Sequence, residues 1–384
     1  MKQKIINLNM ILLIGIISFV CFIQCVQDSE NKEQELYTLD LYHGKRGPKI
    51  VVADDGTVLA FAQGCKLLRR SEDQGQSWSD PEEINLAGGG NAIVDETTGD
   101  VLVVCPLKSF LLRSKDNGKT WIREEIFLKP NKTGHGTPDF LPIDVNSSES
   151  GITLKYGEHK GRLLMPGRIQ LQRAEKYKEN RQEYWQYHYN TSLFSDDGGK
   201  TWQVGEPVQS GTGEGTLAEL SDGRIYYNSR SHMSIDHRRR IAWSYDGGYR
   251  WVDWYVSDEL FEVGGPHYFK YGHHPSYGCN AGLVRVPDEA TGGRDMLIYS
   301  APDNPGATTP HHGRIKMSVW ASTDGTESWP VKRLVYEGLS AYSSLAADKD
   351  GYVYLLFESG DNKLYEKITF VRFDLAWLGL GVEQ

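Results

Sequence analysis

The sequence predicts an all-β protein, a six-bladed β-propeller, and three observations carry this prediction. A turn motif of the form Ser-x-Asp-x-Gly-x-x-Trp recurs along the chain. Most copies follow the same succession of an apolar strand, a turn, a second apolar strand and a third strand. The 41 glycines and 11% aromatic residues of this 384-residue chain suit many short strands joined by turns. Repeated four-stranded units around a shared core are typical of propellers.

The recurring turn, which we call the Asp box, is expected to be structural. Its Asp and Ser side chains can bond nearby backbone N–H groups, its glycine adopts a positive φ, and its tryptophan packs beside the turn. We therefore do not expect the box carboxylates to be catalytic. The five copies, the last of them degenerate, are residues 71–78, 114–121, 195–202, 244–251 and 322–329.

The apolar segments between the boxes give the expected order of the blades. Six first strands and five boxes predict six blades, of which the sixth has no box. A polar connection, residues 129–150, separates the second and third blades, and a connection rich in His and aromatic residues, 261–277, precedes the fifth. The first strands are expected at 49–53, 91–94, 151–154, 216–220, 281–284 and 342–345, and a last strand at 367–375.

The first residues are expected to direct export. Lys2 and Lys4 precede an apolar run, residues 10–23, that is too short to span a bilayer comfortably, and this pattern is typical of a cleaved signal peptide. Cys25 is a candidate for lipid modification and the only expected means of membrane anchoring. The predicted protein is secreted, periplasmic or an outer-membrane lipoprotein. Its predicted parts are a signal peptide at 1–25, a polar tether at 26–41 and the propeller at 42–384.

Charge and cysteine usage exclude several classes of function. The net charge of −9 argues against a nucleic-acid partner, because a protein that binds the phosphate backbone needs a basic face. The cysteines beyond the leader, Cys65, Cys105 and Cys279, are odd in number and widely spaced. They match no disulfide framework and no zinc pattern. We expect neither a metal nor a cofactor.

The connectivity of antiparallel blades predicts where a ligand should bind. The Asp box and the turn between the first two strands lie on one face of each blade, so the starts of first strands and the ends of second strands gather on the other face. The side chains expected on that rim are Arg46, Glu214 and Tyr342 at first-strand starts, Cys65, Arg168, Arg230, Asp303 and Glu358 at second-strand ends, and Arg314 at a third-strand start.

Several arginines, a tyrosine and a glutamate on one rim suit a particular chemistry. Guanidinium groups offer planar donor pairs that clamp a carboxylate and stay charged at any working pH. Tyrosine is a weak nucleophile, but a neighbouring carboxylate can take its proton. A neutral phenol also avoids the repulsion that an acidic nucleophile would meet beside a substrate carboxylate. This is the logic of the glycosidases that use tyrosine.

The chain resembles a known family at these positions. Arg46-Gly47-Pro48, the strand 214–220 with Asn228-Ser229-Arg230 after it, the segment 340–345 and the five boxes are similar to the secreted exo-α-sialidases (neuraminidases), which have a six-bladed propeller. The resemblance implies a retaining glycoside hydrolase that releases sialic acid, or a related 2-keto-3-deoxy sugar acid, from acidic-sugar-terminated glycans. It implies Arg46, Arg230 and Arg314 as the carboxylate triad, Tyr342 as nucleophile, Glu214 as its base and Glu358 as support for Arg46.

One departure from the family pattern concerns the general acid. Gln63-Gly64-Cys65 stands where the family has a longer loop that carries an aspartate. Another acid on the rim could replace it, the substrate could be a different sugar acid or one whose leaving group needs little protonation, or the protein could bind an acidic glycan without cleaving it. The candidate replacement acids are Asp139, His135 and Asp303, together with His267, His273 and His274.

Overall fold

A computed structural model describes residues 36–84, 89–170, 187–232, 236–263, 267–269, 272–274, 278–305 and 313–381. In this part of the chain the regular structure is almost entirely β, with one short helix, α2 (Asp288–Thr291), and one 3₁₀ turn, η1 (Pro106–Lys108). The predicted all-β class is therefore confirmed. None of the described helices is long and apolar enough to cross a membrane. The predicted signal peptide and Cys25 lie outside the described residues.

Three sheets have the predicted four antiparallel strands in sequence order. The first contains β2 (Lys49–Val52), β3 (Val58–Ala62), β4 (Leu67–Ser71) and β5 (Glu82–Glu83). The second contains β6 (Asn91–Asp95), β7 (Asp100–Cys105), β8 (Phe110–Ser114) and β9 (Ile122–Glu125). The third contains β16 (Thr212–Glu219), β17 (Ile225–Ser231), β18 (Arg238–Ser244) and β19 (Val252–Phe261).

The sheet between the second and fourth units has two strands from the connection 129–150 and the residues before it. Its strands are β10 (Phe127–Lys129), β15 (Thr201–Val204), β14 (Tyr189–Ser195), β13 (Leu163–Ile169), β11 (Ile143–Asp144) and β12 (Ile152–Thr153). β10 pairs in parallel with β15, and β11 pairs with the end of β13, where Asp144 lies opposite Arg168. The connection is thus partly built into the sheet.

The largest sheet joins two predicted blades. Its order is β1 (Tyr37–His43), β27 (Lys367–Asp374), β26 (Tyr352–Gly360), β25 (Val331–Ala347), β24 (Ile315–Ser322), β23 (Leu297–Pro302) and β22 (Gly282–Arg285). Residues 331–339 of β25 pair with β24, and residues 339–347 pair with β26. The sequence predicted separate fifth and sixth sheets, but β25 continues without a turn from one set of strands to the other.

The start of the described chain also differs from the prediction, whereas the last strand, β27, lies where it was expected. Residues 37–41 were assigned to the polar tether, but they belong to β1, which pairs with β27. The alternation of Tyr37, Leu39 and Leu41 explains this, because it lets one side of the strand pack on the neighbouring apolar residues. β1 therefore attaches the start of the described chain to its end.

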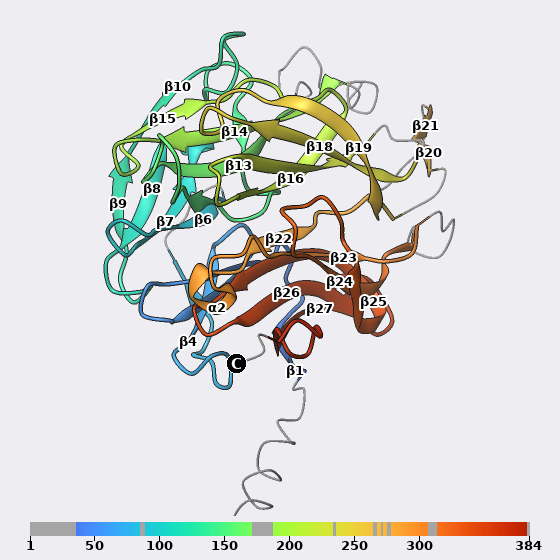
Figure 1. The fold of residues 1–384 in the computed structure, drawn as a ribbon. Helices are drawn as coiled ribbons and strands as arrows, with labels where there is room; N and C mark the ends of the chain where they lie inside the picture. The colour runs from blue at the N-terminus through green and yellow to red at the C-terminus, as the bar shows by residue number, and fades with distance from the viewer. Residues whose placement is uncertain are drawn as a thin grey trace, which may run out of the picture.

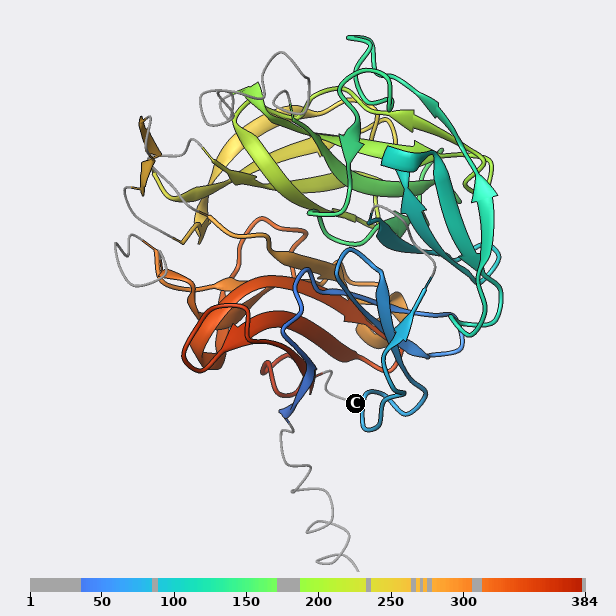
Figure 2. The same cartoon turned by 180° about the vertical axis from the view of Figure 1, so that it is seen from behind.

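The sheets are arranged around a common centre (Figure 1), with β13 to β19 facing the seven-stranded sheet and the hairpin of β20 (His267–Phe269) and β21 (Gly272–His274) at the edge. Viewed from behind, the first sheet lies beside the last one (Figure 2). A buried cluster that includes Ile50, Ala60, Leu356 and Phe370 packs these two sheets together. This contact closes the propeller-like arrangement.

The Asp boxes are structural, as predicted. In the second box Asp116 accepts hydrogen bonds from the Thr120 backbone N–H and hydroxyl, at 2.8 and 2.6 Å. Burial acts to raise the pKa of Asp116, but these hydrogen bonds outweigh it and lower the pKa to about 2. In the third box the Trp202 indole donates to Gly199 at 2.8 Å. In these two boxes the side chains therefore bond to backbone and side-chain groups of the same turn.

Candidate active site

Two β-bulges present the central pair of the site. Glu214 lies in β16 where the pairing register with β17 shifts between Thr212 and Gly215. Tyr342 lies in β25 where the register with β26 shifts between Ser340 and Ser343. A bulge locally interrupts the ladder and re-aims a side chain, which is why bulges are frequent beside active sites. Both side chains leave their sheets here and meet.

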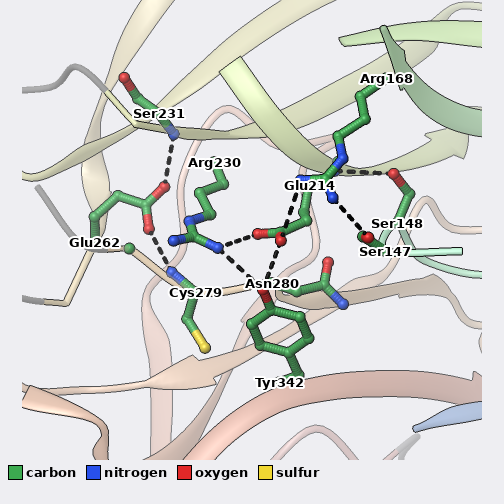
Figure 3. Close-up of polar contacts among 12 residues, drawn as sticks. Ser147, Ser148, Arg168, Glu214, Arg230, Ser231, Glu262, Cys279, Asn280 and Tyr342 are labelled. Carbon is green, nitrogen blue, oxygen red and sulfur yellow. Dashed lines mark hydrogen bonds and ion pairs between the residues drawn. The ribbon is translucent and has the colours of Figure 1, made fainter. Parts of the chain in front are cut away.

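The tyrosine, the glutamate and one arginine form a hydrogen-bonded triangle (Figure 3). The Tyr342 hydroxyl donates to Glu214 Oε1 at 2.5 Å. Arg230, which projects from β17, donates through Nη1 to the Tyr342 hydroxyl at 3.2 Å and forms a short ion pair with Glu214 Oε2. Glu214 and Arg230 are buried, while Tyr342 is partly exposed. The nucleophile candidate thus has its predicted base in direct contact.

The charges around the triangle set the protonation states. Burial alone would raise the pKa of Glu214, but the positive charges of Arg230 and Arg168 hold it well below its usual value. Burial and the negative charge of Glu214 raise the pKa of the Tyr342 phenol well above 10. At neutral pH Glu214 is therefore ionised and Tyr342 carries its proton. These are the states that a carboxylate base and its phenol need before a reaction.

Arg46 is held against its predicted partner. Its Nε and Nη2 donate to the two carboxylate oxygens of the buried Glu358 at 3.0 and 3.3 Å, and Glu358 also accepts from the Gly47 N–H at 3.0 Å. The Arg46 side chain is 52% exposed, so its outer edge faces solvent. Its guanidinium carbon lies 3.7 Å from the ring centroid of Tyr365 and 5.7 Å from that of Tyr342.

Arg314 completes the set of predicted arginines around the tyrosine. It donates to the Tyr365 hydroxyl at 2.6 Å and to the Gly278 carbonyl at 2.9 Å. Its guanidinium carbon lies 5.4 Å from the Tyr342 ring centroid. The three arginines that the sequence assigned to a carboxylate therefore all contact Tyr342, by a hydrogen bond or across its ring.

The predicted replacement acids do not join this cluster. Asp139 is exposed, and His135 shares a hydrogen bond of 2.8 Å with the Tyr189 hydroxyl. Asp303 forms an ion pair with Lys332 at 2.5 Å. No contact recorded among the described residues links these three to Tyr342 or Glu214. His267, His273 and His274 lie on the β20–β21 hairpin, and their side chains fall outside the described part.

The short connection after β3 contains no acid that could act there. Gln63, Gly64 and Cys65 all have positive φ, between 55° and 65°, so the chain reverses within a very tight turn. Cys65 is fully buried, and burial raises the pKa of its thiol to about 12. The thiol is therefore protonated and enclosed. Asn146 of the connection 129–150 lies directly against Gly64.

Sequence reasoning missed residues that complete the site. Arg168 was placed on the rim but given no role, although it contacts Glu214 at 3.4 Å. Asp144 and Ser147 hold Arg168, and no motif marks them because they lie in the irregular connection. Tyr365 also carries no motif signal. Across the part of the chain that the structure describes, no cluster of three or more His, Cys, Asp or Glu could hold a metal ion.

Comparison with known proteins matches this chain to one family. A family model described as a BNR repeat-like domain matches residues 106–355. The sialidase of Micromonospora viridifaciens is 29% identical over 378 residues, which cover 87% of this chain and 52% of that protein. The sialidase of Paraclostridium sordellii is 25% identical, covering 84% of this chain and 83% of that protein. This chain thus spans about half the length of the first relative and most of the second.

Solved structures agree on the fold. The Hadza microbial sialidase Hz136 superposes with a TM-score of 0.63 at 22% identity, covering 86% of this chain and 66% of that one. The leech intramolecular trans-sialidase in complex with 2,7-anhydro-Neu5Ac gives a TM-score of 0.64 at 15% identity, covering 89% and 71%. At such low identity these similarities show the shared fold, and the chemistry must be argued from the residues.

Proposed function

This chain belongs to the sialidase family with BNR (Asp-box) repeats, and from that premise we propose that it is an exo-acting, retaining glycoside hydrolase. Its proposed substrate is a glycan that ends in sialic acid or a related 2-keto-3-deoxy sugar acid. The observation that carries the proposal is the 2.5 Å hydrogen bond from the Tyr342 hydroxyl to Glu214, with Arg230 donating to both residues. A binding scaffold has no need of a phenol paired with an ionised base.

The arginines of the site favour a ligand that carries a carboxylate. Arg46, Arg230 and Arg314 surround Tyr342, and guanidinium groups bind a carboxylate through planar pairs of donors. Burial lowers the pKa of the adjacent His232 well below 6.5, which keeps that ring neutral.

The proposed reaction has two displacements. The substrate carboxylate lies against the three arginines, which brings the anomeric carbon to Tyr342. The phenolic oxygen attacks this carbon while Glu214 accepts the phenolic proton, the bond to the leaving oxygen breaks, and that oxygen takes up a proton. Water then attacks the anomeric carbon and loses a proton to the solvent, the bond to the phenolic oxygen breaks, and Glu214 returns its proton to Tyr342. The sugar acid leaves with its configuration retained.

We also infer that the chain forms six blades around one axis. Residues 331–339 of β25, which pair with β24, form the last strand of the fifth blade, and residues 339–347, which pair with β26, form the first strand of the sixth. A cavity of about 160 Å³ supports the inference, because β2, β6, β12, β16, β22 and β25 all contribute to its lining. Six first strands around one cavity are the arrangement expected of a propeller.

A second candidate function follows from the tight turn at Gly64. Since the connection after β3 has no carboxylate, the leaving group lacks the family's usual proton donor. Loss of a general acid typically lowers the rate by about 10² to 10⁴. The protein would then act as a cell-surface module that binds acidic glycans through its arginines and cleaves them slowly or not at all.

Hydrolysis of a panel of aryl and natural ketosides tests both candidates. The panel covers N-acetylneuraminic, deaminated neuraminic, octulosonic and heptulosaric acids, and the proteins are the wild type, Tyr342→Phe and a control, Tyr354→Phe. Tyr354 also donates to a carboxylate, Asp348, at 2.5 Å, but away from the site. Turnover by wild type and control that is lost in Tyr342→Phe supports the hydrolase. Absence of turnover by the wild type, with sugar-acid binding lost in Arg230→Gln, supports the binding module.

A further inference from the structure

Arg168 contacts Glu214 Oε1, the same carboxylate oxygen that accepts the hydrogen bond from Tyr342. Its Nη1 donates to Glu214 Oε1 at 3.4 Å, and the same oxygen accepts the Tyr342 hydroxyl (Figure 3). Its other terminal nitrogen, Nη2, donates to Ser147 Oγ at 2.8 Å and to Asp144 Oδ2 at 3.3 Å. The side chain is 13% exposed. The guanidinium therefore bridges the connection 129–150 and the base.

The part of this connection that holds Arg168 also fills the space above the short turn after β3. Asp144 is paired in register with Arg168, and its Oδ1 accepts the Asn146 N–H at 3.1 Å. Asn146 packs so closely on Gly64 that a Cβ added there would lie 2.3 Å from its Oδ1. The segment 144–147 is thus held by Arg168 at both of its ends, Asp144 and Ser147, and by the tight turn at Asn146 between them.

Arg230 has two tasks that compete once a substrate binds. It forms an ion pair with Glu214 Oε2, and in the proposed function it also binds the substrate carboxylate. A guanidinium that turns its donors toward a ligand weakens its hold on an existing partner. A second cation on Glu214 Oε1 would keep the base in place while Arg230 engages the substrate.

We propose that Arg168 is a positioning residue for Glu214, held in place by Asp144 and Ser147, and that it keeps the carboxylate aimed at the Tyr342 hydroxyl while substrate is bound. This inference rests on the proposed hydrolase function. Arg168 acts through Glu214 and does not touch the substrate. The segment 144–147 therefore contributes to catalysis as a support for the base.

The groups that face Glu214 agree with this role. From β17 and the residue after it come Arg230 and His232, from β25 comes Tyr342, and from β13 comes Arg168. His232 is neutral and Tyr342 carries its proton. Arg168 and Arg230 are therefore the two cations that face the base among the described residues, and both act to lower the pKa of Glu214 against the effect of burial.

Steady-state kinetics on the best ketoside test the proposal. In Arg168→Gln we expect kcat to fall about 10- to 100-fold, because a small displacement of a reacting group is sufficient for such a loss, while KM changes less than about threefold. Arg168→Lys, which keeps the charge, should recover part of kcat. The control is Arg113→Gln, since Arg113 is as buried and binds two carboxylates far from the site. It should change stability and leave both constants as in the wild type.

Ser147→Ala keeps the test decisive if Arg168→Gln does not fold. It removes the 2.8 Å hydrogen bond to Arg168 and leaves every charge in place, so kcat should fall about two- to fivefold at unchanged KM. Unchanged kcat in Ser147→Ala and Arg168→Lys, or a rise in KM alone, would overturn the proposal. If the wild type cleaves ketosides and Tyr342→Phe does not, the hydrolase function stands, and such an outcome in the Arg168 and Ser147 variants overturns the positioning role alone. If the wild type cleaves none, the hydrolase function and this inference fail together.

Discussion

Glu149 provides a quantitative prediction about stability. It is fully buried at the centre of the fold, where Oε1 accepts the Ser344 hydroxyl at 2.5 Å and the Ser150 N–H at 2.8 Å. No described residue donates a hydrogen bond to Oε2. Burial outweighs the charge of Lys49 and raises the pKa of Glu149 from 4.5 to about 7. The folded protein therefore keeps a proton that the unfolded chain releases above pH 4.5.

The sign and the size of the effect follow from proton linkage. Because the folded-state pKa is raised, the contribution of Glu149 to stability is fully present below pH 4.5 and is lost as the pH rises to about 7. Each pKa unit corresponds to about 1.4 kcal/mol, so between pH 5 and pH 8 the wild type should lose about 2 to 3 kcal/mol relative to a neutral side chain. For a domain of this size that corresponds to about 3 to 4 °C in Tm.

Glu149→Gln is the variant that measures it. The amide has nearly the same shape, keeps an acceptor for Ser344 and does not ionise, so its Tm should exceed that of the wild type increasingly between pH 5 and pH 8. The assay is thermal unfolding at unit pH steps, with the exposed Glu82→Gln as control, which should follow the wild type. Parallel Tm curves for wild type and Glu149→Gln would refute the assignment of a raised pKa to this carboxyl.

Three further predictions concern other parts of the fold. Tyr365→Phe removes the hydroxyl that accepts a hydrogen bond from Arg314 and keeps the ring against Arg46. Because Arg314 is then held less firmly for the substrate carboxylate, KM for a ketoside should rise about 5- to 20-fold with little change in kcat. An unchanged KM would contradict this account. Asp116→Asn should lower the unfolding free energy at pH 7 by about 1 kcal/mol. Because the lowered pKa makes Asp116 stabilising only when ionised, this difference should vanish as the pH falls from 4 to 2. A difference that persists at pH 2 would argue against this account. Gly64→Ala should destabilise the protein by about 1 to 3 kcal/mol in denaturant unfolding, since a Cβ at φ +65° would clash with Asn146, and a neutral result would show that the turn can relax.

The sequence identified the central site because its residues occupy ends of regular strands. In antiparallel blades the starts of first strands and the ends of second strands lie on one rim. Such positions are occupied by Glu214, Arg230 and Tyr342, which are in contact in the structure. Arg46 meets Glu358 for the same reason.

Other features depend on tertiary contacts that leave no periodic signal. Arg168 acquires its partners only because β11 forms within an irregular connection, and nothing in the sequence of that connection predicts its register. β25 runs without a turn from its pairing with β24 to its pairing with β26. The apolar pattern of the sequence does not show that one strand serves both neighbours. β1 is partly exposed and far in sequence from β27, so its pairing could not be predicted from local residues.

Trapping the covalent intermediate tests the central claim most directly. A fluorinated ketoside slows the second displacement, so the sugar acid should remain attached to the enzyme long enough for intact-mass and peptide mass spectrometry. The account predicts one adduct, on the peptide that contains Tyr342, and its absence in Tyr342→Phe. An adduct on another residue, or undiminished turnover by Tyr342→Phe, would contradict the assignment of Tyr342 as the nucleophile.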